Sequence, residues 1–510
     1  MSNFTQSIYQ LIVKTSTTLP NDVENALEKA RNEEIFGTRS KMSLDIIDEN
    51  NFMAQSLKSP ICQDTGMPTF YIKTPVATNQ IEIKKAVENA VVLATKNAIL
   101  RPNAVDSLSG KNSGDNLGRY VPVIYFEQWE ADFIDVRLIL KGGGCENKNM
   151  QYSLPMEIEG LGRADRGLEG VRKCILHAVF SAQGQGCGPG FLGVAIGGDR
   201  ASGYAHAKKQ LLRKVNDKNN DNMLADLEEF ILNQSQELGI GTLGFGGKTT
   251  LLGCKIGAIH RLPASYFISI AYMCWAYRRM GVKIDQQTGE IFDWTYEQNE
   301  NPVDKTISTD MKQEIKKIST PVTDEMVREL RVGDIVQITG IIYTGRDEVH
   351  KWLFDSNESP TSLQGQILYH CGPVMKKNSN GSYKVLAAGP TTSMREEPYQ
   401  ADIIKKYGVK AVIGKGGMGN NTLAALKECG AVYLNAIGGA AQYYAKTVSK
   451  VGGVHFLEEF GVPEAMWTLD VNNFTAIVTM DSYGESLHKQ VEMDSFKRLC
   501  SLKNASFQWK

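Results

Sequence analysis

The chain has 510 residues, of which 42% are apolar and 22% charged, and its 56 basic and 57 acidic side chains leave a formal net charge of −1. A chain of this length exceeds what one compact core usually organises, so we expect two or three domains. The near balance of charge disfavours nucleic-acid and membrane-surface partners, because both select a basic excess.

The N-terminal segment lacks the charged-then-apolar order of a signal peptide and holds no arginine for a transit peptide. No run of about 18 uncharged apolar residues occurs, so we expect no membrane-spanning helix. The nine cysteines are scattered without a CxxC pair, which is typical of reduced thiols. We therefore expect a cytoplasmic protein with neither a nucleic acid nor a membrane as its partner.

The first 293 residues contain patterns that predict both helices and strands. One helix is predicted to begin at the cap-forming Asn21, because Val23, Leu27 and Ala30 then fall on one face. The other patterns predict helices at residues 80–100, 169–182 and 222–238, and strands at residues 121–129, 133–141 and 192–198. An apolar stretch at residues 266–277 carries Cys274.

Polarity rises over residues 294–310 with no apolar period, which predicts a linker. After it the pattern alternates, and residues 409–437 predict a strand, a glycine loop, a helix and a second strand, which form a βαβ unit. We therefore predict an α/β protein with a mostly helical N-terminal domain at residues 1–293 and a C-terminal α/β domain at residues 311–510.

The glycine loop of that unit, "GKGGMG", fits the dinucleotide-binding pattern G-x-G-x-x-G at Gly414, Gly416 and Gly419. That fingerprint also needs an acid about 20 residues on to hold a ribose, where this chain has Asn435. Lys415 places a cation where a helix N-terminus already favours an anion, and a carboxylate suits that arrangement as well as a pyrophosphate does.

A second glycine-rich stretch, residues 241–250, is similar to a phosphate-binding P-loop. Its Lys248 comes one position too late for that motif, so a tight turn in a packed domain is favoured over a nucleotide site.

The stretch "ICQDTG" places Cys62 in a polar turn beside Gln63, Asp64 and Thr65. A buried structural cysteine usually has apolar neighbours. The pattern therefore indicates that this sulfur is a ligand or a nucleophile.

Nine short motifs, taken in order, resemble those of the class I fumarases, which are iron–sulfur hydratases, in the form that joins the α and β subunits in one chain. The motifs are "ICQDTG" (61–66), "LRPNA" (100–104), "KGGGCENK" (141–148), "GCGPG" (186–190), "GFGGKTT" (244–250), "MCWA" (273–276), "TGRDEVH" (344–350), "AAGPTTSMR" (387–395) and "GKGGMG" (414–419). The resemblance implies a C-terminal domain of the swivelling type and an active site between the two domains.

The resemblance implies a 4Fe–4S cluster held by Cys62, Cys187 and Cys274. Three thiolates leave one iron without a protein ligand, and that iron would act as a Lewis acid on the hydroxyl and carboxylate of malate. The implied reaction is the reversible hydration of fumarate to (S)-malate, both of which are small dicarboxylates.

The resemblance also assigns residues to the substrate. The cations Arg101, Arg346, Arg395 and Lys415 would hold the dianion, because arginine grips a carboxylate with two bonds and lysine adds a point charge. Thr391 would be the base, helped by Asp64, and His260 would face the substrate of the partner subunit in a homodimer. The implied substrate-binding set is Gln63, Asp64, Arg101, Gly144, Arg346, Thr391, Arg395 and Lys415.

Several alternatives stay open from the sequence. A sister activity on tartrate or mesaconate differs by one hydroxyl or methyl, a dinucleotide-dependent oxidoreductase would use the loop at residues 414–419, and a non-catalytic iron sensor would need no base. Thr391 and Thr392 could merely close a turn. Asp347 and His350 are candidates for supporting groups. Cys145 departs from the small residue that many members carry, and Cys254 and Cys371 are rival ligands.

Overall fold

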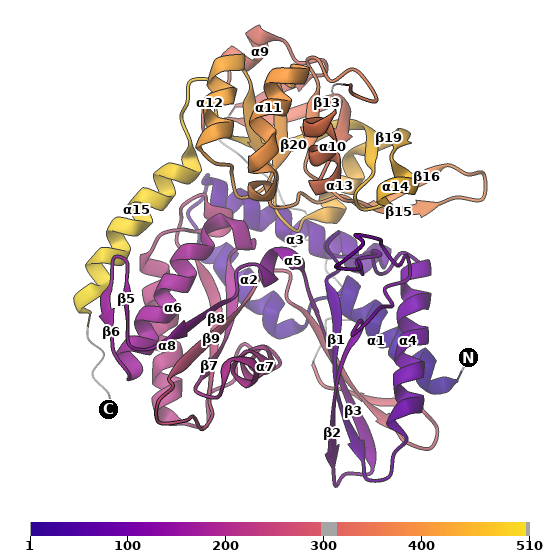
Figure 1. The fold of residues 1–510 in the computed structure, drawn as a ribbon, viewed down its shortest axis with the longest axis vertical. Helices are drawn as coiled ribbons and strands as arrows, with labels where there is room; N and C mark the ends of the chain where they lie inside the picture. The colour runs from indigo at the N-terminus through magenta and orange to yellow at the C-terminus, as the bar shows by residue number, and fades with distance from the viewer. Residues whose placement is uncertain (1, 297–313, 357, 506–510) are drawn as a thin grey trace. The chain divides into compact units, whose positions relative to one another are not determined.

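The computed structural model describes residues 2–296, 314–356 and 358–505 (Figure 1). The chain forms two compact units, each assembled from separate segments. Unit 1 contains Met1–Asn21, Ile46–Gly142 and Arg278–Ser486, and unit 2 contains Asp22–Asp45, Gly143–Tyr277 and Leu487–Lys510. Both units mix helices with strands, so the predicted α/β class is confirmed.

The predicted linker at residues 294–310 lies outside the described residues from position 297 onward, so the division of the sequence at that linker stays a prediction. None of the helices in the described ranges is long and apolar enough to cross a membrane.

The first sheet of unit 1 has the strand order β11–β10–β3–β1–β2, with β1 and β2 parallel and the other pairs antiparallel. The apolar faces of α1 and α4 pack with the central strands into one core, which removes their side chains from water. The elements are α1 (Asn3–Thr17), α4 (Gln80–Lys96), β1 (Met67–Pro75), β2 (Val123–Trp129), β3 (Phe133–Lys141), β10 (Arg278–Asp285) and β11 (Ile291–Trp294).

Helix α4 begins where the sequence predicts, because the Asn79 side chain accepts the N–H groups of Ile81 and Glu82. It ends at Lys96 rather than at residue 100. Ala98 adopts a left-handed φ of 57°, which stops the helix three residues before Arg101.

The second sheet of unit 1 has the order β12–β13–β14–β17–β18–β20–β19. Strand β20 also pairs with β13, so β13, β14, β17, β18 and β20 form a closed ring of pairings. Helices α10, α11 and α12, drawn in orange in Figure 1, pack against this sheet with a shared apolar core. The elements are α9 (Asp324–Arg328), α10 (Asp347–Asp355), α11 (Glu397–Tyr407), α12 (Asn420–Cys429), α13 (Ala441–Thr447), α14 (Leu457–Phe460), β12 (Ile315–Ser319), β13 (Ile335–Thr344), β14 (Ile367–Tyr369), β17 (Ala411–Gly414), β18 (Val432–Asn435), β19 (Val448–His455) and β20 (Met466–Met480), with the separate hairpin β15 (Val374–Lys377) and β16 (Tyr383–Ala387).

The predicted βαβ unit is confirmed as β17, α12 and β18, whose two strands run parallel. Its glycine loop lies between β17 and α12, so Lys415 follows directly after a buried strand.

Unit 2 is built on a mixed sheet with the order β4–β9–β7–β8, which packs with α6, α7 and α8. The apolar stretch that carries Cys274 forms strand β9 up to Met273. The elements are α2 (Asn21–Glu33), α5 (Gly143–Glu146), α6 (Leu168–Ala182), α7 (Arg200–Gln210), α8 (Asn222–Glu237), α15 (Leu487–Ser501), β4 (Met150–Ser153), β5 (Met156–Ile158), β6 (Gly162–Ala164), β7 (Gly190–Ile196), β8 (Leu251–Ala258) and β9 (Phe267–Met273), and α3 (Arg39–Leu57) crosses from unit 2 into unit 1.

The core of the first sheet gives a direct test of the fold. Leu138 lies in the central strand β3 with no exposed surface, so Leu138→Ala should destabilise the chain by about 2–5 kcal/mol through lost burial and a cavity. Leu108→Ala, at a side chain that is 96% exposed, is the matched control and should leave the urea midpoint unchanged. Equal midpoints for the two variants would contradict this core.

Candidate active site

The "ICQDTG" segment of unit 1 is buried, although its residues are mostly polar. Cys62 is 8% exposed, and its Sγ lies 3.4 Å from Oε1 of Gln63. The Gln63 amide donates to the carbonyl of Pro390 at 3.1 Å. This bond connects the segment to the stretch 387–395, which holds Thr391. Burial raises the pKa of the Cys62 thiol, while the charges of Arg278 and Lys415 act in the opposite direction and favour the thiolate.

Asp64 is surrounded by three guanidinium groups. Burial by itself would raise the pKa of this carboxyl, but Arg101, Arg278 and Arg346 together hold it at about 2. Arg101 Nη2 lies 3.5 Å from Asp64 Oδ1, and Arg278 Nη2 donates to the Asp64 carbonyl at 2.8 Å. Asp64 is therefore ionised at neutral pH.

Arg101 is buried and Arg346 is half-buried, and the two lie close enough that the charge of Arg346 acts on Arg101. Burial lowers the pKa of Arg101, and the positive charge of Arg346 lowers it further. Arg101 donates to the Gly372 carbonyl at 2.6 Å, and Arg346 pairs with Glu464 at 2.8 Å. The Nε of Arg346 has no hydrogen-bond partner within the described ranges. Positive charge concentrated in this way suits an anionic ligand.

Thr391 is held at both its backbone and its hydroxyl group. Its N–H donates to the carbonyl of His370 at 2.7 Å, and its Oγ1 accepts a hydrogen bond from Arg395 Nη2 at 3.0 Å. The same Arg395 nitrogen lies 3.2 Å from Asp347 Oδ2. A cationic donor on the hydroxyl oxygen stabilises its alkoxide form, which is what a threonine needs in order to act as a base.

The glycine loop presents Lys415 to this group of residues. Gly416 and Gly417 take left-handed φ values of 77° and 74°, which permit the tight turn after β17. Lys415 is 8% exposed, and its charge acts on the Cys62 thiol. Asn435, at the position where a dinucleotide site needs an acid, accepts the Gly416 N–H at 3.0 Å and so braces the loop itself.

Unit 2 gathers three thiols around one tyrosine ring. Burial raises the pKa of the Tyr272 hydroxyl far above its ordinary value, and Cys145, Cys274 and Cys187 lie close enough to raise it further. Cys187 takes a left-handed φ of 55°, and its carbonyl accepts the N–H of Trp275 at 3.2 Å. The segments that carry Cys187 and Cys274 are thereby joined.

The chemistry of these donors suits thiolate ligation within each unit. Unit 1 offers Cys62 beside cations, and unit 2 offers Cys187 and Cys274 among glycines that let backbone amides approach sulfur. Across the described ranges, no group of three His, Cys, Asp or Glu side chains is arranged to hold a single metal ion.

The structure places the predicted site residues in two sets. Unit 1 holds Cys62, Gln63, Asp64, Arg101, Arg346, Thr391, Arg395 and Lys415. Unit 2 holds Gly144, at the start of α5, together with Cys187, Cys274 and His260. His260 is exposed and lines a cavity of about 430 Å³ with Arg261, Pro263 and Tyr266.

Sequence reasoning missed Arg278, which is 1% exposed and touches Asp64. Its signal was present, since Arg278 and Arg279 directly follow a long apolar stretch and charged residues are seldom buried without a partner. Of the rival thiols, Cys371 faces Arg101, Arg346 and Cys62, and burial raises its pKa to about 12. Cys254 lies instead beside the charged groups Glu228, Lys255 and Arg213.

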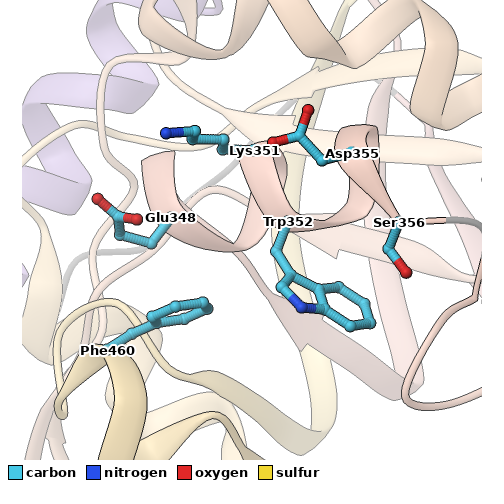
Figure 2. A pocket seen from close by; sticks show the side chains of 6 residues that line it. All are labelled: Glu348, Lys351, Trp352, Asp355, Ser356 and Phe460. Atoms are coloured by element: carbon cyan, nitrogen blue, oxygen red, sulfur yellow. The ribbon is translucent and has the colours of Figure 1, made fainter.

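A separate cavity of about 360 Å³ lies along α10 (Figure 2). Trp352 and Phe460 lie on one side of the helix, and Lys351 and Asp355 lie on the other. None of the predicted site residues lines it.

Comparisons with known proteins cover nearly the whole chain. Residues 5–283 match the family described as fumarate hydratase (Fumerase), and residues 289–491 match the family described as fumarase C-terminus. A protein of Geobacillus stearothermophilus named "Putative fumarate hydratase class I" is 60% identical over 99% of this chain and 100% of its own length.

Two proteins of Methanocaldococcus jannaschii match parts of the chain. "Putative L(+)-tartrate dehydratase subunit beta" is 44% identical over 35% of this chain and 94% of its own length. "Putative L(+)-tartrate dehydratase subunit alpha" is 35% identical over 53% of this chain and 94% of its own length.

Glu396 gives a test of the electrostatics behind Thr391. Its side chain is fully buried, and neither carboxyl oxygen has a hydrogen-bond partner in the part of the chain that the structure describes. Burial, together with the charge of Asp347, raises its pKa from 4.5 to about 8, although Arg395 lies 3.8 Å away. Because the folded state then binds more protons than the unfolded state between these values, stability should fall as pH rises from 4.5 to 8.

Glu396→Gln should abolish that loss. The variant should match the native chain near pH 4.5 and exceed its free energy of unfolding by a few kcal/mol above pH 8, as measured by urea unfolding across this range. Glu459→Gln, at an exposed position on α14, is the control and should follow the native curve. Parallel curves for native chain and Glu396→Gln would contradict a neutral buried Glu396.

Proposed function

Because the chain belongs to the class I fumarate hydratase family and is a hydro-lyase, we propose that it catalyses the reversible hydration of fumarate to (S)-malate. The observation that carries this proposal is the group of buried and half-buried cations in unit 1. Arg101, Arg346 and Lys415 there accompany Asp64, whose pKa is held at about 2, and a hydroxyl held by Arg395. A small dicarboxylate supplies the negative charge that such a group requires.

In the proposed reaction, Thr391 Oγ1 takes the proton from the carbon next to one malate carboxylate. Negative charge then develops on that carboxylate, and each well-placed cation can lower the barrier by roughly 3 kcal/mol. The hydrogen bond from Arg395 stabilises the alkoxide before the transfer. The electrons left on carbon form the double bond of fumarate as the hydroxyl group leaves the neighbouring carbon as hydroxide. The proton that Thr391 took then converts this hydroxide to water, which restores the alkoxide.

We propose that Cys62, Cys187 and Cys274 hold a 4Fe–4S cluster. When bound, the cluster supplies a Lewis-acidic iron that makes the hydroxyl a better leaving group. The proposal includes a homodimer in which each His260 serves the other subunit, which its exposure in unit 2 supports. A reducing compartment such as the cytoplasm suits cysteines that form no disulfide within the described ranges.

L(+)-tartrate is the second candidate substrate, and the relatives named as tartrate dehydratase subunits favour it. Tartrate differs from malate by one hydroxyl, and mesaconate differs from fumarate by one methyl. A hydrogen-bonding site discriminates a hydroxyl strongly, so the ratio of kcat/KM values distinguishes these substrates.

Anaerobic reconstitution with iron and sulfide tests the whole proposal. The reconstituted chain should be brown and should interconvert fumarate and malate with a higher kcat/KM than for tartrate or mesaconate. Serine at position 62, 187 or 274 should abolish both colour and turnover. Full activity in a chelated, colourless sample would overturn the proposal, and a preference for tartrate would replace its substrate.

Two adjacent threonines provide a matched test of the base. Thr391→Val should lower kcat by about 10²–10⁴ with the iron content unchanged, because the proton acceptor is lost. Thr392→Val is the control, since the Thr392 hydroxyl is buried with no hydrogen-bond partner within the described residues. Equal rates for the two variants would remove Thr391 from the base role.

The two glycines on either side of Cys187 provide a test of cofactor binding. A Cβ at Gly186 would lie 2.5 Å from the ring of Tyr272, so Gly186→Ala must displace the buried ring around which the thiols gather. At Gly188 the nearest atom would be 3.5 Å away, so Gly188→Ala is the control. After reconstitution, Gly186→Ala should retain less iron per chain than Gly188→Ala, and equal iron contents would contradict this prediction.

A further inference from the structure

A continuous chain of buried polar groups lies behind the unit 1 site. His350 on α10 and His370 after β14 both approach one amide, that of Gln400 on α11, at 3.0 and 2.8 Å from their Nε2 atoms. His370 Nδ1 lies 2.8 Å from Ser393 Oγ, which lies 2.8 Å from the hydroxyl of Tyr433. All five side chains are fully buried. Water therefore cannot satisfy them, and their hydrogen bonds must be mutually consistent.

The proton positions follow from the Arg346 carbonyl. His350 Nδ1 lies 2.8 Å from this oxygen, which can only accept, so Nδ1 carries a proton. Burial lowers the pKa of His350 and of His370, so both rings are neutral, and the Nε2 of His350 has no proton of its own. A bare ring nitrogen must face a donor. The amide atom that it meets must therefore be the nitrogen of Gln400, which requires the amide to be turned from the orientation with its oxygen toward the histidines.

Turning the amide by half a rotation exchanges its oxygen and nitrogen. With the oxygen toward the histidines, the amide nitrogen is buried without a partner in the described part of the chain. With the nitrogen toward them, its two N–H groups donate to the two Nε2 atoms. Only the amide oxygen is then left without a partner among the described residues, whereas the other orientation leaves two N–H groups without one. An unmade bond of a buried donor is costly, so the turned orientation is favoured.

We propose that Gln400 is a positioning residue: its amide nitrogen donates to Nε2 of both His350 and His370 and so fixes the backbone from which Arg346 and Thr391 project. His350 holds the carbonyl of Arg346, and the carbonyl of His370 holds the N–H of Thr391 at 2.7 Å. Ser393, which follows His370 in this row of hydrogen-bonded side chains, donates its N–H to the Lys415 carbonyl at 3.1 Å. One amide thus links three segments that carry proposed substrate-binding residues.

The activity tests of this role rest on the proposed function, whereas a hydrogen-exchange test does not. The charged groups that face the two imidazoles are Asp347 and Arg395, and neither is altered by a change at Gln400.

Gln400→Met keeps the length of the side chain and removes its hydrogen bonds. It should lower kcat/KM for the preferred dicarboxylate at least tenfold, with both a lower kcat and a higher KM. Gln234→Met, at an equally buried glutamine of unit 2 whose Oε1 accepts from Arg172, is the matched control for lost stability and should change each constant less than twofold. Unchanged constants in Gln400→Met would overturn the proposal.

Gln400→Glu tests the direction of the hydrogen bonds. An ionised carboxylate only accepts, so His350 must take up a proton to face it. The kcat/KM of this variant should be impaired at pH 8.5 and should recover at least threefold relative to the native chain at pH 6.5. A Gln400→Glu variant that matches the native chain at both pH values would show that Gln400 accepts rather than donates, and would overturn the assignment.

Hydrogen–deuterium exchange separates this proposal from the proposed function. In Gln400→Met, backbone amides of residues 389–397 and 413–419 should exchange at least tenfold faster than in the native chain and in Gln234→Met. This result is expected whether or not the chain acts on fumarate. Unchanged exchange in these two segments would overturn the positioning role even in an active enzyme.

Discussion

The carboxylate of Asp64 and the guanidinium groups of Arg101, Arg278 and Arg346 form the interaction on which unit 1 depends. The three arginines come from distant parts of the sequence, and like charges so close together would repel one another without the anion between them. The ionised carboxylate makes their proximity possible, and Glu464 assists at Arg346. The surplus of positive charge that remains is suited to a substrate with two negative groups.

Around this group, backbone contacts help to set the positions of the functional residues. Thr391 is anchored through its N–H, Lys415 through its carbonyl, and Arg101 through the N–H that it donates to Thr65 Oγ1 at 3.0 Å. Side-chain contacts add to these anchors, since Arg395 holds the Thr391 hydroxyl and Glu464 pairs with Arg346. Rigid supports of this kind place reacting groups without reorganisation during the reaction.

Much of this architecture could be predicted from the sequence, because it depends on local patterns. The amphipathic period of α2, the glycine loop after β17 and the short motifs are all visible in consecutive residues. The burial of Arg278 and the shared amide of Gln400 were not predicted, because both depend on partners that are distant in the sequence. Asp64 lies 214 residues from Arg278, and His370 lies 30 residues from Gln400. Helix α4 was predicted four residues too long, since periodicity does not reveal the left-handed turn at Ala98.

The closed ring of strands β13, β14, β17, β18 and β20 has an evolutionary consequence. All five strands lie inside one continuous stretch of sequence, so this barrel can be inherited, lost or fused as a single genetic block. A gene that encodes this barrel together with the rest of the chain delivers the two parts in equal numbers at every round of translation. Independent genes would have to balance their expression to reach the same stoichiometry.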